Sequence, residues 1–167
     1  MDQVSLIGRN ERLERNLYLA IVDDLTTWTP DLSTVPPPFA ALCVLDARNE
    51  DDASLEAFAS RLLAAGCEWM CGWGPDGEGD LLHDVFDDVF VRETQGEWEE
   101  DENVVTTAHD GETIDEALWF AIFNTSHPWH DIPSVLAVVS PLYAEHVARR
   151  LADSDQLSAD VVGNEAG

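Results

Sequence analysis

The sequence contains no lysine, and its eight arginines are outnumbered by 34 aspartates and glutamates among 167 residues. The formal net charge is therefore -26. Proteins that bind nucleic acid or anionic lipid directly use clustered lysine and arginine side chains, which this chain has in only small numbers. We therefore expect no direct binding to nucleic acid and no binding to a membrane.

Long apolar runs are also missing, because no stretch approaches the roughly 20 residues of a membrane-spanning helix. The first 15 residues contain acids and no long apolar stretch, so they do not resemble a signal peptide. Cysteine is scarce and odd in number, with Cys43, Cys67 and Cys71 in strand-like surroundings. We expect reduced thiols in the core of a cytoplasmic protein.

The excess of acid has three interpretations, which stay open at this point. Concentrated salt shortens the Debye length from about 10 Å to about 3 Å, so the charge can be an adaptation to salt. A GC-rich codon bias can replace lysine with arginine without any such adaptation. The acids can also form a docking surface, and Glu97, Glu99, Glu100, Asp101 and Glu102 crowd one short stretch.

From residue 38 to residue 152 the chain alternates between strand-like and helix-like patterns. Strands are expected at 39–45, 67–73, 90–92, 103–107 and 134–139. Helices are expected from a cap at Asp51 or Asp52 to a stop at Gly66, from an Asp80 cap to residue 89, from a capping box at Thr113–Glu116, and from Pro141. This alternation predicts an α/β three-layer sandwich with a mostly parallel sheet of about four or five strands, Rossmann-like or flavodoxin-like.

The two ends of the chain are harder to interpret. Residues 1–37 form an N-terminal segment that ends in a proline-rich connection, and Leu17–Val22 fits either a helical stripe or a short strand. Arg9, Arg12 and Arg15 alternate with glutamates, which favours a salt-bridged helix. Residues 153–167 are expected to be a flexible acidic tail.

Candidate catalytic residues lie where the predicted strands end. Ligands bind beyond the carboxyl ends of parallel strands, and Asp46, His109 and Asp110 stand at such ends. If the strand that ends before Asp46 and the strand that ends before His109 are neighbours, as in a flavodoxin-like order, Asp46 and His109 share a crevice and can support general-base chemistry. The alternative is that both aspartates only cap the turns after their strands and that His109 is a partly exposed polar residue.

A glycine-rich turn and two histidines complete the candidates. Gly72–Gly77 has the G-x-G-x-x-G pattern, so Trp73, Gly74 and Asp76 are candidate cofactor contacts. Nearby carboxylates would repel a pyrophosphate, so we expect no cofactor. His127 and His130 have a spacing that suits a metal but lack an obvious partner, so no metal site is expected.

Five short motifs follow one another in the order of the predicted elements: Pro-Pro-Pro-Phe before the first strand, Ala-Gly-Cys entering the second, Trp73-Gly-Pro-Asp76 leaving it, Thr106-Thr-Ala-His-Asp110, and Asp115-Glu-Ala-Leu-Trp119. In this succession the chain resembles an uncharacterised prokaryotic family, a domain of unknown function, over residues 36 to 152. The resemblance implies one structural unit, and it implies no activity or site residues.

These observations favour a non-catalytic protein-binding module of the accessory, inhibitor or immunity type, with a protein partner that can be basic. Trp98 and Trp129, in predicted loops, can anchor such a partner. The alternative is a small hydrolase or nucleotide-handling enzyme that uses His109, Asp110 and Asp46. The oligomeric state is left open.

Overall fold

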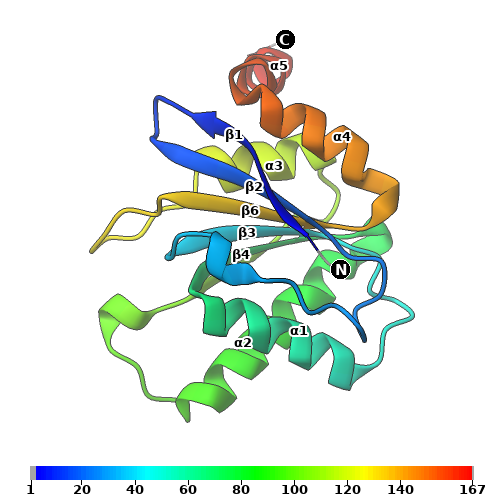
Figure 1. Ribbon diagram of the computed structural model, residues 1–167, viewed down its shortest axis with the longest axis vertical. Helices are drawn as coiled ribbons and strands as arrows, with labels where there is room; N and C mark the ends of the chain where they lie inside the picture. Colours follow the sequence, from blue (N-terminus) through cyan, green and yellow to red (C-terminus); the bar gives the residue numbers. More distant parts are fainter. Residues whose placement is uncertain (1–2, 167) are drawn as a thin grey trace.

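The computed structural model describes residues 3–166, with side chains up to Gly163, as a sheet between two layers of helices (Figure 1). The strands are β1 (Val4–Asn10), β2 (Arg15–Ile21), β3 (Phe39–Val44), β4 (Cys67–Trp73), β5 (Val105–Ala108) and β6 (Ser134–Val139). The α-helices are α1 (Asp52–Ala65), α2 (Glu78–Thr94), α3 (Ile114–Phe123), α4 (Pro141–Ala152) and α5 (Ser154–Ala166). Short 3-10 turns lie at Leu32–Thr34, Pro75–Gly77 and Glu100–Glu102.

The sheet has six strands in the order β1-β2-β6-β3-β4-β5. Each adjacent pair of strands in the series β2-β6-β3-β4-β5 is parallel, whereas β1 pairs antiparallel with β2. The expected mostly parallel α/β sheet is confirmed, but the expected number of four or five strands is wrong. The additional strands are β1 and β2, which form a hairpin. They lie in the N-terminal segment, where the sequence left helix and strand undecided.

The hairpin also replaces the salt-bridged helix expected around Arg9, Arg12 and Arg15. Side chains of β2 alternate between the two faces of the sheet, with Leu17 on one and Tyr18 on the other. Arg15 is only 8% exposed and donates hydrogen bonds to the carbonyl of Ile122 at 2.7 Å and to the hydroxyl of Thr125 at 3.0 Å. The Arg15 guanidinium thus forms hydrogen bonds inside the protein, and its burial lowers its pKa.

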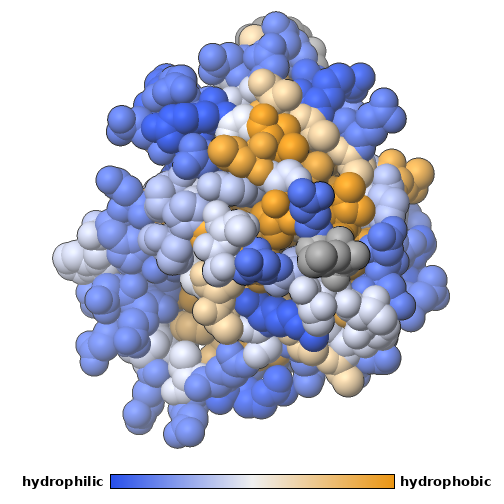
Figure 2. All heavy atoms as spheres, in the orientation of Figure 1, coloured by the Kyte–Doolittle hydropathy of each residue, from blue (hydrophilic) through white to orange (hydrophobic). Residues whose placement is uncertain are grey.

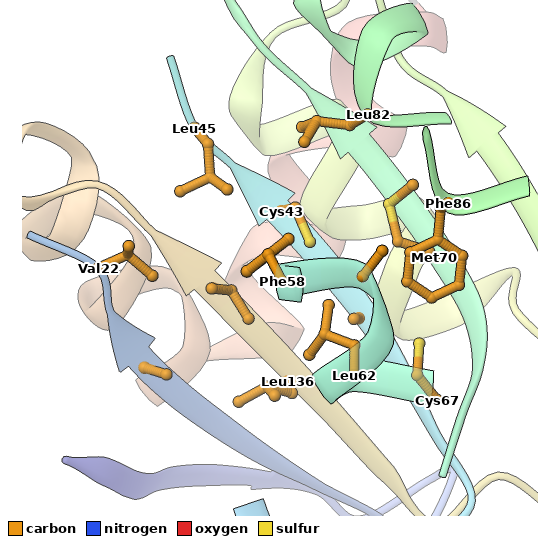
Figure 3. Close-up of a cluster of buried hydrophobic side chains, with 14 of the residues drawn as sticks. Val22, Cys43, Leu45, Phe58, Leu62, Cys67, Met70, Leu82, Phe86 and Leu136 are labelled. Carbon is orange, nitrogen blue, oxygen red and sulfur yellow. The ribbon is translucent and has the colours of Figure 1, made fainter. Parts of the chain in front are cut away.

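Apolar side chains fill the space on each side of the sheet. On one face, α1, α2 and the segment between β2 and β3 cover β3 and β4, and Phe58, Leu62, Met70 and Phe86 belong to one buried cluster (Figure 3). On the other face, α3, α4 and α5 enclose a second cluster that includes Leu118, Val147 and Leu157. Two covered faces explain why β3 and β6 are apolar at nearly every position.

The three cysteines lie in this interior and are free thiols, as expected. Burial raises the pKa of Cys71 to about 12 and raises those of Cys43 and Cys67 as well. Buried thiols with raised pKa values are poor nucleophiles at neutral pH. They contribute to packing in the core rather than to chemistry.

Several helix boundaries differ from the sequence prediction. Residues 90–92, expected as a strand, belong to α2, which continues to Thr94 and ends at Gln95 with a left-handed backbone (φ 57°). The tail expected to be flexible forms α5 over Ser154–Ala166, with Leu157 and Val161 buried. The capping box of Thr113 and Glu116 is confirmed at the start of α3.

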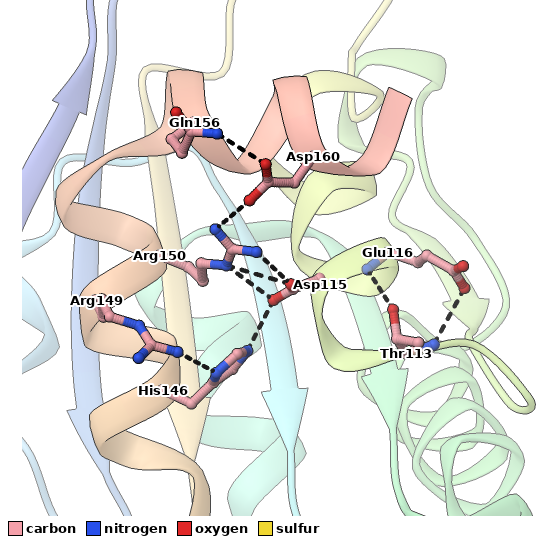
Figure 4. A network of polar contacts seen from close by, with 8 residues as sticks. All are labelled: Thr113, Asp115, Glu116, His146, Arg149, Arg150, Gln156 and Asp160. Atoms are coloured by element: carbon pink, nitrogen blue, oxygen red, sulfur yellow. Dashed lines mark hydrogen bonds and ion pairs between the residues drawn. The ribbon is translucent and has the colours of Figure 1, made fainter. Parts of the chain in front are cut away.

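Ion pairs join α5 to the rest of the fold (Figure 4). Arg150 of α4 donates to the Asp115 carboxylate of α3 at 2.7 Å and to the Asp160 carboxylate of α5 at 2.8 Å. His146 Nε2 lies 2.7 Å from Asp115. These three helices are therefore linked by charge as well as by packing.

The outside of the molecule is largely hydrophilic on the face that Figure 2 shows, with an apolar area in the region of β1 and α4. Leu6 and Leu142 are 60% and 81% exposed. None of the helices in the described part of the chain combines the length and the apolar character needed to cross a membrane.

Candidate functional site

Asp110, the last residue of the predicted catalytic group, caps a helix. Its two carboxylate oxygens accept hydrogen bonds from the backbone amides of Gly79 and Asp80, each at 3.0 Å. These amides belong to the first turn of α2, where free N–H groups would otherwise attract a phosphate. The protein's own carboxylate therefore takes the place of an external anion, and α2 begins at Glu78 instead of at an Asp80 cap.

The glycine-rich turn before α2 allows close packing. A Cβ on Gly74 would lie 2.4 Å from the Cβ of Glu78 and 2.9 Å from the carbonyl oxygen of Leu45. Gly77 has a φ of 90°, which favours glycine. Trp73 donates from its indole nitrogen to the carbonyl of Glu112 at 2.9 Å. The assignment of Trp73, Gly74 and Asp76 as cofactor contacts stays a prediction.

Asp46 lies beyond the end of β3 in a cluster of charges around Arg48. The guanidinium contacts Asp46 at 2.9 Å and Asp76 at 3.1 Å, and its Nε pairs with Glu78. The hydrogen bond from Arg48 lowers the pKa of Asp46 to about 2. Glu78 is only 4% exposed and accepts from the amide of Ala47 at 2.9 Å, and burial raises its pKa.

His109 has different partners. It is 4% exposed, with Nδ1 at 2.6 Å from the carboxylate of Glu112 and Nε2 at 2.8 Å from the hydroxyl of Thr107. Its ring packs against Phe120 at a centroid distance of 4.7 Å.

In the structure, the side chain of His109 is thus paired with Glu112, and that of Asp46 with Arg48. Because β4 separates β3 from β5, the condition under which Asp46 and His109 would share a crevice, that their two strands are neighbours, is not met. The catalytic assignment of His109, Asp110 and Asp46 stays a prediction, without the shared crevice that motivated it.

A second group of candidates lies away from these strand ends, around the acidic stretch. A pocket of about 520 Å³, which we call the acidic pocket, is lined by Glu99, Glu100, Asp101 and Trp129. Trp129 is 62% exposed. Trp98 is 41% exposed and packs against Phe90 with ring centroids 4.9 Å apart. The two tryptophans expected in loops are therefore both accessible, and one of them lines a pocket with carboxylates.

Two histidines flank Trp129 and meet a carboxylate. His127 and His130 stack with ring centroids 3.8 Å apart, and His130 Nε2 pairs with the carboxylate of Glu68. One potential ligand atom from each of the three residues lies within 4.8 Å of the other two. The sequence showed the spacing of the histidines, but no local signal pointed to Glu68, which comes from β4.

The comparison with known families gives a match over residues 18–141, from β2 to the first residue of α4. The matching family is described as a domain of unknown function, DUF7684. The chain belongs to this family. The resemblance found in the sequence is thereby confirmed, and the match begins further toward the N-terminus than residue 36 because it includes β2. No curated protein and no solved structure matches the chain.

Proposed function

We propose that this protein is a non-catalytic binding module that takes a basic, arginine-containing segment of a partner protein into the acidic pocket. The observation that carries the proposal is the arrangement of Glu99, Glu100 and Asp101 beside the exposed ring of Trp129. Such a module can act as an accessory, inhibitor or immunity-type protein toward a basic partner.

The chemistry of the acidic pocket suits an arginine side chain. A guanidinium group forms paired hydrogen bonds with carboxylates and also stacks on the face of an aromatic ring. Each of these interactions strengthens when the partner side chain is drawn out of water. A simple metal ion would bind the carboxylates but gain little from the indole. A phosphate would be repelled by the carboxylates.

The acidic stretch has a fixed local shape, which lowers the entropy cost of binding. Glu99 and Glu102 form a reciprocal capping box around the 3-10 turn at Glu100–Glu102. The amide of Glu99 donates to the carboxylate of Glu102 at 3.2 Å. The box engages the carboxylates of Glu99 and Glu102 with backbone amides, and the preformed turn presents the exposed carboxylates of Glu100 and Asp101 without first having to order a flexible loop.

The residues at the strand ends support binding over catalysis. Asp110 is occupied with the amides of α2, and Asp46 with Arg48. A carboxylate committed to a structural hydrogen bond is a poor general base, because deprotonating a substrate would break that bond.

The test uses nona-arginine peptide as a defined probe, titrated into the full chain at 0.3 M KCl by isothermal calorimetry. The triple variant Glu99→Gln, Glu100→Gln, Asp101→Asn removes three charges from the pocket. The control Asp23→Asn, Asp88→Asn, Glu145→Gln removes three exposed charges from elsewhere. Both variants change the net charge equally.

We expect the pocket variant to weaken binding by roughly tenfold or more, since each lost charged hydrogen bond is worth about 1.4 kcal/mol or more. The control should lose less than about twofold. Equal losses in the two variants would show that the peptide senses only the overall charge, and would overturn the proposal.

The proposal also covers the environment and the type of fold. Carboxylates spread over the surface suit a cytoplasm rich in salt, where repulsion between them is screened.

The helices that follow β3 and β6 lie on opposite faces of the sheet, as in a doubly wound, Rossmann-like fold in the broad sense. The strand order matches neither the flavodoxin order nor the dinucleotide-binding order.

A further inference from the structure

We infer that Glu68, His127 and His130 form a binding site for a divalent transition metal ion of the zinc class. The inference does not depend on the acidic pocket or on any partner protein, because metal affinity is a property of the three side chains alone. It also changes the expectation from the sequence, which lacked a third ligand for the two histidines.

The positions of the ligand atoms are the first argument. They lie within 4.8 Å of one another. Two ligands of a tetrahedral zinc ion, each about 2.0–2.2 Å from the metal, are separated by about 3.4 Å. Shifts of little more than 1 Å therefore bring all three atoms to coordination spacing: the wider separations close, and the paired atoms of His130 and Glu68 move apart. Rotation of the imidazole rings about χ2 supplies movements of this size.

The backbone of β4 is the second argument. Along the pairing of β3 with β4, Phe39 faces Cys67 and the next residue, Ala40, faces Trp69. Glu68 is thus an extra residue at a shift in the register between β3 and β4, and shifts of this kind redirect side chains. Here the shift lies at the start of β4, and the Glu68 carboxylate meets His130 of the segment that precedes β6.

His127 is the third argument. Its Nε2 atom is buried and has no hydrogen-bond partner among the described residues, while Nδ1 accepts from the amide of Trp129 at 3.2 Å. A buried polar atom without a partner costs free energy, and a metal ion would satisfy it. Coordination through Nε2 moves the ring proton to Nδ1, so the long hydrogen bond from Trp129 is given up and the two stacked rings turn apart.

The ligand set selects the class of metal. Two imidazoles and one carboxylate suit zinc and its neighbours among the transition metals, whereas calcium and magnesium prefer oxygen ligands only. Three protein ligands leave a fourth position for water. Glu68 also lines a pocket of about 310 Å³ together with Glu93 and Glu102.

The experiment uses Zn²⁺ alone as the probe, added to the chelator-treated full chain in competition with a chromophoric zinc indicator. Carboxylates elsewhere bind Zn²⁺ weakly, so the measured quantity is the tightest single equivalent. The variants are Glu68→Gln, His130→Gln and the double variant His127→Ala, His130→Ala. The control is His83→Ala, which removes a histidine of α2 that lies outside the group.

We expect one tight equivalent in the wild type and in the control. We expect at least about a tenfold weaker affinity after Glu68→Gln or His130→Gln, and loss of the tight equivalent in the double variant. Co²⁺ should give the ligand-field absorption of a tetrahedral nitrogen and oxygen site in the wild type and in the control, and not in the double variant. Circular dichroism checks that each variant is folded. An affinity for Zn²⁺ that is the same in the wild type and the folded double variant would overturn the inference.

Discussion

The carboxylate of Asp110 accepts a hydrogen bond from the amide of Gly79 at 3.0 Å, although the two residues are 31 positions apart in the chain. This contact ties the end of β5 to the start of α2. It also explains a glycine, because a Cβ on Gly79 would lie 2.7 Å from Oδ1 of Asp110 and 2.5 Å from the carbonyl oxygen of Gly72.

The first prediction concerns this cap. Asp110→Ala should lower the free energy of unfolding by about 1–2 kcal/mol, as the loss of a helix N-cap does, because two amides of α2 lose their acceptor. Urea unfolding measures the change, and hydrogen exchange of the Gly79 and Asp80 amides should accelerate. A stable variant with unchanged exchange would show that the cap contributes nothing.

The second prediction compares two glycines in helices. Gly79→Ala should destabilise the protein by about 1–3 kcal/mol, because the new methyl group meets backbone oxygen below contact distance. Gly163→Ala in α5 should stabilise it by about 0.5–1 kcal/mol, since nothing lies within 4 Å of its Cβ position. Thermal unfolding of both variants is the measurement. The same sign for both would contradict the packing described for the start of α2.

The third prediction concerns pH. Burial opposes the ionisation of Asp115, but hydrogen bonds from Arg150 and His146 outweigh it and hold its pKa below the ordinary value. A carboxylate with a lowered pKa in the folded state stabilises the protein above its unfolded pKa of about 3.9, and this contribution is lost as the pH falls further.

Asp115→Asn should therefore cost about 2 kcal/mol near pH 7, and the difference from the wild type should shrink as the pH falls below about 4. Urea unfolding at several pH values follows this difference, with Asp84→Asn as an exposed control. A difference that stays constant down to pH 2 would mean that the ion pairs of Asp115 do not provide the stabilisation.

The fourth prediction concerns salt. With a formal charge of -26, the folded chain should lose stability in dilute buffer and regain it in molar KCl, where the Debye length falls to about 3 Å. Circular dichroism during dialysis between the two conditions is the measurement. Full stability in dilute buffer would leave codon bias as the better explanation of the missing lysine.

The sequence predicted the elements whose signals are local. The apolar runs of β3 and β6 and the capping box at Thr113 depend on neighbouring residues, and each lies where it was expected. Residues 90–92 were wrongly expected to form a strand because three bulky residues in a row resemble one. On a strand Val89 and Val91 would lie on the same face, but Val89 is buried and Val91 is 47% exposed, as on a helix. The helix α5 was missed although Leu157 and Val161 have helical spacing.

Features that depend on distant residues were beyond the sequence. The start of α2 is set by Asp110, which stands 30 residues after Asp80. Similarly, the partner of His130 is Glu68, which is 62 positions away. The sequence could also state the adjacency of the strands before Asp46 and His109 only as a condition, because strand order decides which strand ends are neighbours and no local pattern encodes it.

The most direct test of the central claim is to map where a basic segment binds. Amide chemical shifts of the full chain are recorded by NMR while nona-arginine peptide is added at 0.3 M KCl. Our account predicts that the largest changes fall on residues 97–102 and on Trp129 and its indole, with small changes at the exposed acids of α2. Changes spread evenly over acidic residues, or centred on Asp46 and His109, would contradict it.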